Sequence, residues 1–451
     1  MYRRIVVPSV SGVALALGAC VATDRNVTEP VNVDAQLRQA IGAYGVVPIA
    51  AVPQQDSALV ALGRVLFFDK ELSGSRDVAC ATCHQPSTTM GDAQPLAVGT
   101  GGVGSGPSRT PGPGRTYVPR NAPTVLNVAL GLPYVFLDGR ITGFNGSFTT
   151  PAGGALPAGL PNVVAAQAMF PVTNRREMRG EAGDTDVLGR SNELAFVGDS
   201  DWTGIWQAVT KRLVAIPAYV NAFHAAFPNT LPSQLGFQHA ATAIAAFEMQ
   251  QLTRTDSPFD RYLKRDDQAL TPEQKRGALL FFGKATCSSC HNGPFLGGQG
   301  FADVGVPQVG PGLATQPPLD LGRGELPGND FYQFAFRIAP LRNVELTAPY
   351  FHDGVYQTLA QVVHHYNDAR TDLASFDPAT LPVDVRGLYH GDAATITAVL
   401  DHLDFRLQQP LQLTATEQAE LVAFLQSLTD ASARNLSALR PATVPSGLPV
   451  P

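Results

Sequence analysis

Apolar residues recur at helical spacing over long stretches of the chain. Leu59, Leu62 and Leu66 fall on one face of a helix that begins at Ser57 and ends before Asp69. The same spacing predicts helices over residues 162–170, 202–214, 217–227, 231–251 and 414–428. Two stretches rich in glycine, proline and serine, residues 99–114 and 143–161, interrupt the pattern. The pattern therefore predicts a mostly α fold with long Gly/Pro-rich loops.

A six-residue repeat indicates two related halves. The sequence G-x-x-L-F-F occurs at residues 63–68 and again at residues 277–282. The pattern breaks at residues 253–258, and Thr271 then starts a helix with Pro272 at the first position and Gln274 in a capping box. A chain of 451 residues is long enough for two cores, so we expect domains at residues 55–253 and 254–430. Packing of the last helix back onto the first domain is left open.

Three further segments flank these domains. Residues 1–20 carry Arg3 and Arg4 before an apolar stretch too short to span a bilayer, as in an export signal. Residues 17–20 resemble a bacterial lipobox and predict lipidation of Cys20, with ordinary cleavage nearby as the alternative. Residues 21–54 are expected to form a tether and residues 431–451 a disordered tail. We expect an exported protein on the periplasmic side, lipid-anchored to a bacterial membrane, with the outer membrane favoured.

Four of the five cysteines belong to two copies of C-x-x-C-H, at residues 80–84 and 287–291. This is the attachment motif of a c-type haem: the cysteines form thioethers and the histidine reaches the iron. The predicted cofactors are two haem c groups, bound through Cys80, Cys83, Cys287 and Cys290, with His84 and His291 as iron ligands. The two copies lie too far apart for a zinc site, and a redox or disulfide function leaves both histidines unexplained. The net charge of −6 argues against nucleic acid as a partner.

The second iron ligand decides the chemistry of each haem. None of the five methionines follows Met249, so the second haem needs another residue type. In the predicted helix after Thr358, Tyr366 falls in the middle of the apolar face, whereas His364 and His365 point away from it. Tyr366 is therefore a buried core tyrosine or a phenolate ligand that favours ferric iron.

No histidine lies between His84 and His224, so the first haem has no obvious nearby ligand on its open face. A haem that binds peroxide needs a general base within hydrogen-bond reach. Glu177 is a candidate for this base, and a solvated surface carboxylate is the alternative.

Several motifs resemble those of bacterial di-haem cytochrome c peroxidases and the related MauG enzymes. They are LGRVLFFD, PRNAPT, DGR, SPFD and LRNVELTAPYFHDG, at residues 62–69, 119–124, 138–140, 257–260 and 341–354. The resemblance extends from about residue 57 to 429. It implies two cytochrome c-like haem domains packed against each other, with the peroxidatic haem in the first and the electron-transfer haem in the second.

The resemblance also implies roles for single residues. Gln167, Pro171 and Glu177 match the distal pocket over the first haem, with Glu177 as the acid–base residue and Gln167 helping orientation. Tyr366 stands where the peroxidases have a methionine ligand and MauG has tyrosine.

A calcium ion between the domains is also implied, with Asn121, Thr347 and Pro349 as its oxygen ligands. Two departures from the family stand out. Residues 85–120 contain no histidine to cap the resting first haem, as in MauG, and Leu137 replaces the tryptophan that relays electrons between the haems.

The expected function is that of a di-haem c-type peroxidase. It would reduce H₂O₂ at an open first haem with electrons relayed through the second, donated by a small c-type cytochrome or a cupredoxin. One alternative is a MauG-like oxidase that uses H₂O₂ to modify a partner protein. The other is a non-enzymatic electron-transfer lipoprotein.

Overall fold

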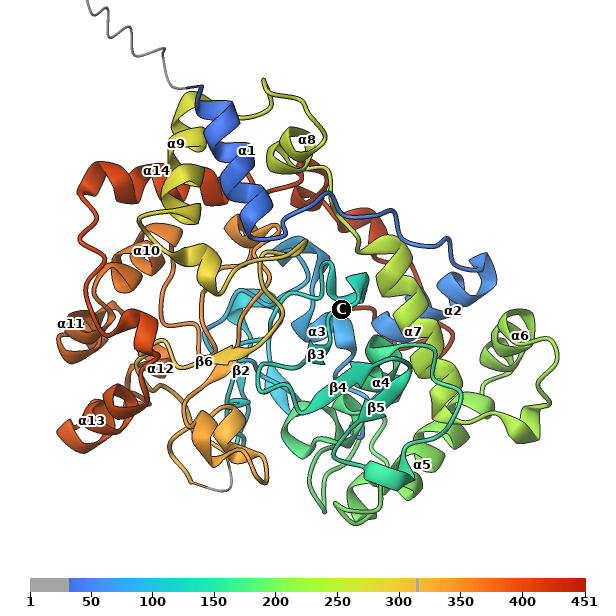
Figure 1. The fold of residues 1–451 in the computed structure, drawn as a ribbon. Helices are drawn as coiled ribbons and strands as arrows, with labels where there is room; N and C mark the ends of the chain where they lie inside the picture. The colour runs from blue at the N-terminus through green and yellow to red at the C-terminus, as the bar shows by residue number, and fades with distance from the viewer. Residues whose placement is uncertain (1–31, 314–315) are drawn as a thin grey trace, which may run out of the picture.

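The computed structural model describes residues 32–313 and 316–451. Helices of all types hold 44% of the residues and strands 6%, which confirms the mostly α fold. Long irregular segments connect the helices and converge in the centre of the molecule (Figure 1). No helix in the described ranges is both long and apolar enough to cross a membrane. The expected signal segment and Cys20 lie outside the described residues.

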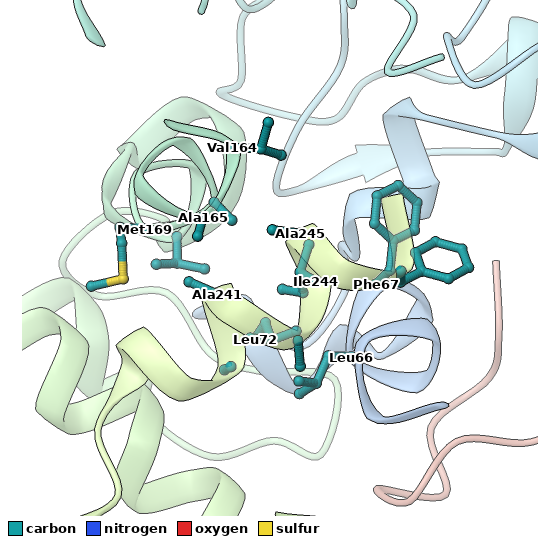
Figure 2. Packing of buried hydrophobic residues seen from close by; sticks show 14 of the residues in the cluster. Leu66, Phe67, Leu72, Val164, Ala165, Met169, Ala241, Ile244 and Ala245 are labelled. Carbon is teal, nitrogen blue, oxygen red and sulfur yellow. The ribbon is translucent and has the colours of Figure 1, made fainter. Parts of the chain in front are cut away.

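The first domain is built around two crossing helices, α2 and α7, with α4 packed on α7. Figure 2 shows their contact, where Leu66 and Phe67 of α2 meet Ala241, Ile244 and Ala245 of α7. The helices of this domain are α2 Ser57–Phe68, α3 Cys80–Cys83, α4 Val163–Ala168, α5 Trp202–Val214, α6 Pro217–Ala226 and α7 Phe237–Gln251.

The second domain repeats this arrangement with α9 and α14 as the crossing pair and α10 beside α14. Its helices are α8 Pro258–Leu263, α9 Pro272–Phe282, α10 Leu359–Asn367, α11 Ala369–Ala374, α12 Val383–Arg386, α13 Ala393–His402 and α14 Ala415–Gln426. The last helix thus packs within its own domain, so the arrangement left open above is not adopted.

The sequence repeat marks the same structural position in both domains. A Cβ atom at Gly63 would lie 1.8 Å from the Ala243 carbonyl oxygen of α7, and one at Gly277 would lie 1.8 Å from the Glu420 carbonyl oxygen of α14. Only glycine allows helix backbones to approach so closely. The two phenylalanines that end each repeat then pack on one partner ring, Phe247 of α7 or Phe424 of α14. The repeat is therefore a helix-crossing motif.

The strands are only two to four residues long, and each sheet lies within one domain. β1 Gly102–Val103 pairs with β2 Thr110–Pro111 within a loop. The antiparallel sheet of β3 Tyr134–Val135, β4 Ile141–Phe144 and β5 Ser147–Thr149 belongs to the first domain. β6 Phe301–Ala302 pairs with β7 Phe336–Arg337 in the second domain. The main-chain nitrogen of Arg337 donates to the Leu137 carbonyl (2.7 Å), which connects the domains.

Two flanking segments differ from expectation. Helix α1 Val33–Ala43 occupies part of the expected tether, and its residues Leu37 and Ile41 are buried in the core of the second domain. At the other end, Leu436 and Leu439 of the expected disordered tail are buried in the core of the first domain. The tail lies against α2: Arg64 Nε donates to the Leu439 carbonyl (2.7 Å), and the Ser446 hydroxyl donates to Asp69 just after the helix (2.6 Å). In α1, Val33, Leu37 and Ile41 recur every four residues, but this period is confined to the 11 residues of the helix. The tail offers only the pair Leu436 and Leu439 as large apolar residues ahead of its prolines, yet each segment covers an apolar surface of a domain.

Candidate active site

The first haem-attachment motif lies on α3, which packs against α2. The Thr82 hydroxyl accepts a hydrogen bond from the Ala79 main chain (2.9 Å) and shapes the turn that presents Cys80 and Cys83. His84 Nδ1 lies 3.1 Å from the Met90 carbonyl, which accepts its hydrogen bond and leaves Nε2 for iron. Burial lowers the pKa of His84, so the ring is neutral as a ligand must be. The donor set therefore fits a c-type haem.

The second attachment motif has the same design. His291 Nδ1 lies 3.2 Å from the Leu296 carbonyl and 3.1 Å from the Ala339 carbonyl, and burial lowers the pKa of His291 to about 4. A cavity of about 310 Å³ opens beside this histidine, with Cys287 and Cys290 in its wall and mostly apolar residues around it. A haem plane with two thioether bonds fits such a cavity.

Tyr366 lines this same cavity. The capping box formed by Thr358 and Gln361 starts α10, and the helix then turns Tyr366 toward the cavity. His365, on the other face, is fully buried: its Nδ1 lies 2.9 Å from Asp372 and its Nε2 lies 2.7 Å from the Val304 carbonyl. Burial raises the pKa of Tyr366 above its usual value. Tyr366 thus lines the cavity and His364 and His365 do not, while iron ligation by Tyr366 stays a prediction.

Glu177 lies on one π-helical turn, Arg175–Arg179, a conformation common at functional sites. The Asn174 side chain caps this turn by accepting from the Glu177 main-chain nitrogen (3.1 Å). Gln167 lies in the last turn of α4, and Pro171 begins the short 3₁₀ helix Pro171–Thr173 between α4 and the Glu177 turn. The three residues are therefore carried by one continuous segment of short helical turns.

This segment packs against residues 98–100, a loop that follows the first attachment motif and contacts Cys83. The Cys83 thiol contacts the Val98 carbonyl at 3.8 Å, and the Thr100 main-chain nitrogen donates to the Glu177 carbonyl (3.1 Å). Between them, a Cβ atom at Gly99 would lie 2.0 Å from the Arg176 carbonyl. Burial raises the pKa of Glu177, and the positive charges of Arg140 and Arg120 partly offset this effect. Glu177 is thus a partly buried carboxyl close to the first haem-attachment motif.

Arg120 joins the two domains by a buried ion-pair cluster. Its guanidinium contacts Asp138 of the first domain at 2.6 Å and Asp320 of the second at 2.6 Å. Arg140 contacts Asp138 as well, at 3.3 Å, and these charges with their hydrogen bonds lower the pKa of Asp138 to about 2 despite its burial. Leu137, just before Asp138, lines the cavity of the second haem.

Two of the three residues expected to bind calcium, Asn121 and Thr347, line a small polar pocket of about 10 Å³ together with Gly91 and Ala348. Both also line the larger cavity of the second haem, and Pro349 lines only that larger cavity. The Asn121 amide nitrogen donates to the Gln94 carbonyl (2.6 Å), which leaves the amide oxygen free to face the pocket. The described residues offer no cluster of three or more histidine, cysteine or acidic side chains for a metal. Neutral oxygen donors in a pocket of this size suit a single hard cation.

Sequence reasoning assigned no final role to three polar residues at these sites. Glu248 of α7 is buried, its Oε2 has no hydrogen-bond partner among the described residues, and burial raises its pKa to about 8. His352 is buried against the Phe336 ring at 3.8 Å, and burial lowers its pKa to about 4. Arg337 lines the second haem cavity. A glutamate within the apolar stripe of α7 was a usable signal, and His352 belongs to the motif at residues 341–354, whereas nothing in the local pattern marks Arg337.

Comparison with known proteins identifies the family. A model of the di-haem cytochrome c peroxidases matches residues 57–268. The cytochrome c551 peroxidase of Pseudomonas aeruginosa is 35% identical over 302 residues, which cover 67% of this chain and 69% of that protein. The methylamine utilization protein MauG of Methylorubrum extorquens is 30% identical over 82% of this chain and 77% of its own length.

Solved structures share the fold. A MauG-like protein associated with microbial copper homeostasis superposes with a TM-score of 0.58 at 24% identity, covering 87% of this chain and 95% of that one. The diheme peroxidase BthA of Burkholderia thailandensis superposes with a TM-score of 0.56 at 21% identity, over 90% and 96% of the two chains. The chain belongs to the di-haem cytochrome c peroxidase and MauG family. It is a peroxidase-type oxidoreductase, and the family implies two haem c groups.

Proposed function

We propose that this protein reduces hydrogen peroxide at the haem attached to Cys80 and Cys83. The electrons would come from a small c-type cytochrome or a cupredoxin and pass through the haem attached to Cys287 and Cys290. The observation that carries the proposal is the contact of the Glu177 turn with the loop beside Cys83. Bound haem supplies the redox chemistry of peroxide reduction.

The chain's own residues would move the proton. The Glu177 carboxylate would accept a proton from one oxygen of the peroxide and donate it to the other oxygen, which leaves. The Gln167 amide would orient the peroxide by hydrogen bonds. Because the pKa of Glu177 is raised, the carboxyl lies closer to the working pH than a solvated glutamate does. Pro171 lacks an N–H and helps to set the bend between the two residues.

Replacement of Glu177 by glutamine tests this role. The amide cannot take up the proton, so we expect kcat/KM for peroxide, measured with reduced cytochrome c, to fall at least 100-fold. The acid limb of the wild-type pH profile should lie above the ordinary glutamate pKa of about 4.3 and should be absent from the residual activity of the variant.

The matched control for this experiment is Glu181→Gln, which removes the neighbouring exposed acid that contacts Arg175 at 3.5 Å. This variant should retain full activity. If Glu177→Gln carries both haems and turns over at the wild-type rate, Glu177 is not the acid–base residue.

A MauG-like oxidase that modifies a partner protein is the second candidate. The position of Tyr366 in the cavity wall and the lack of histidine in residues 85–120 favour it, whereas Leu137 at the tryptophan position argues against it. Fast steady turnover with reduced cytochrome c would favour the peroxidase. A ferric spectrum with only low-spin haem would instead favour simple electron transfer.

We also propose that the small pocket at Asn121 and Thr347 binds one Ca²⁺. Chelator-treated protein should then bind one equivalent in a calorimetric titration. At a free concentration of 100 times Kd, this binding should stabilise the fold by about 2.7 kcal/mol. Asn121→Ala should lose the binding, whereas Asn221→Ala, on an exposed face of α6, should keep it. The absence of binding heat in the wild-type protein would exclude the site.

Export and lipid attachment at Cys20 are proposed from the sequence. Cys20→Ala should release the protein from the membrane fraction and abolish incorporation of labelled fatty acid. A soluble wild-type protein without label would contradict the anchor.

A further inference from the structure

The cavity of the second haem has three arginines in its wall, Arg337, Arg342 and Arg406. Arg342 pairs with the buried Asp260, and Arg406 pairs with Asp404 at 2.7 Å. These two guanidinium groups therefore have carboxylate partners within the chain. Their positive charges are balanced before any cofactor binds.

Arg337 differs from the other two. Its Nε donates to the Phe136 carbonyl (3.2 Å), but its buried Nη1 has no acceptor among the described residues. Burial lowers its pKa to about 10, and no acidic side chain offsets this effect. At neutral pH the group is still charged, and its buried Nη1 has no counter-ion among the described residues, which is unfavourable unless an anion completes the site.

The anion must come from the group that fills this cavity. A haem attached to Cys287 and Cys290 brings two propionate carboxylates, and a guanidinium is well suited to bind a carboxylate through parallel N–H bonds. We propose that Arg337 binds a propionate of the second haem. Hydrogen bonds from its side chain to Phe136 and from its main chain to Leu137 then hold this carboxylate against the first domain.

The proposal depends only on haem attachment at the second motif, which the family membership supports. It requires neither the peroxide chemistry nor ligation by Tyr366. The test of this proposal measures the reduction potential of each haem in the intact protein. The Arg337 proposal can therefore fail while the peroxidase function holds, and the reverse is also true.

Arg337→Gln is the informative change. Loss of a positive charge beside one haem favours its ferric state, so one of the two reduction waves should shift to lower potential by at least tenfold in equilibrium constant, about 59 mV for one electron. The other wave should move by less than a third of that. Arg337→Lys keeps the charge and should leave both waves within a threefold change of the wild-type equilibrium.

The matched control is Arg323→Gln. Arg323 also lies at the domain junction, where it donates to the Asp138 carbonyl (3.1 Å), but it stacks on the Phe301 ring outside the cavity. Both waves of this variant should stay within a threefold change. If Arg337→Gln shifts neither wave, shifts both equally, or shifts them no more than Arg323→Gln does, the proposal is wrong.

A second measurement covers the case in which Arg337→Gln does not accumulate with both haems. In Arg337→Lys, the ammonium cannot reproduce the two parallel hydrogen bonds of a guanidinium. The propionate bending band in the resonance Raman spectrum should therefore move relative to the wild-type band. An unchanged band in this variant would overturn the assignment.

Discussion

Tyr366 and Glu177 lie on different kinds of local structure. Tyr366 follows from the regular period of a capped helix, so its direction was predictable from the positions of Leu359 and Val363. Glu177 lies on a π-helical turn after a 3₁₀ helix, where no simple period applies. Its place beside Cys83 depends on the loop contact at Gly99, which sequence spacing alone does not reveal.

The role of Tyr366 can be tested in the resting protein. Tyr366→Phe should alter the low-spin ferric EPR signal and raise the potential of one haem by more than tenfold in equilibrium constant, about 59 mV, because an anionic ligand favours ferric iron. Tyr350→Phe is the control, since Tyr350 lines the same cavity but donates its hydroxyl to the Val344 carbonyl (3.1 Å). A low-spin signal unaffected by Tyr366→Phe would show that Tyr366 is not a ligand.

At the scale of elements, the two domains share one helix-crossing design. The sequence repeat predicted related halves, but it did not reveal that Gly63 and Gly277 permit the backbone contacts. Their partner helices, α7 and α14, share only an Ala-Phe pair, Ala246-Phe247 and Ala423-Phe424, whose ring receives the two phenylalanines. The contacts join residues far apart in the chain, and such pairings are not visible in a local pattern.

Gly277→Ala should therefore destabilise the protein even though alanine is the better helix former. The new methyl group would overlap the Glu420 carbonyl, so α9 and α14 must separate, and we expect a loss of about 1–3 kcal/mol. Gly42→Ala in α1 meets no atom within 4 Å and should be neutral or stabilising by up to about 1 kcal/mol. Thermal unfolding of the holoprotein compares the two variants. Equal stability would contradict the close contact.

At the scale of the whole molecule, each domain is completed by a segment that the sequence did not assign to it. Helix α1 covers the second domain through Leu37 and Ile41, and the tail covers the first through Leu436 and Leu439. The helical period of α1 is confined to 11 residues, and the prolines of the tail interrupt its apolar pattern, so neither contact was recognised from the sequence. The arrangement of the domains was predictable only through the family resemblance.

Leu436→Ala tests the contribution of the tail. Leu436 is 2% exposed, so its truncation should lower the free energy of unfolding by roughly 2–5 kcal/mol. Thr443→Ala, at an exposed position of the same segment, should change it by less than about 0.5 kcal/mol. Denaturant titration of the two variants measures the difference, and a Leu436→Ala protein as stable as the wild type would mean that the tail does not cover the core in solution.

The return of the chain from the second domain to the first has a practical consequence for dissecting the enzyme. A fragment that stops at the domain boundary would leave uncovered the apolar surface on which Leu436 and Val444 rest. The isolated first domain should therefore be used for spectroscopy only if residues 431–451 are attached to it. We recommend a permuted form of the first domain in which residues 431–451 are joined ahead of Ser57, so that the domain keeps the segment that covers its core.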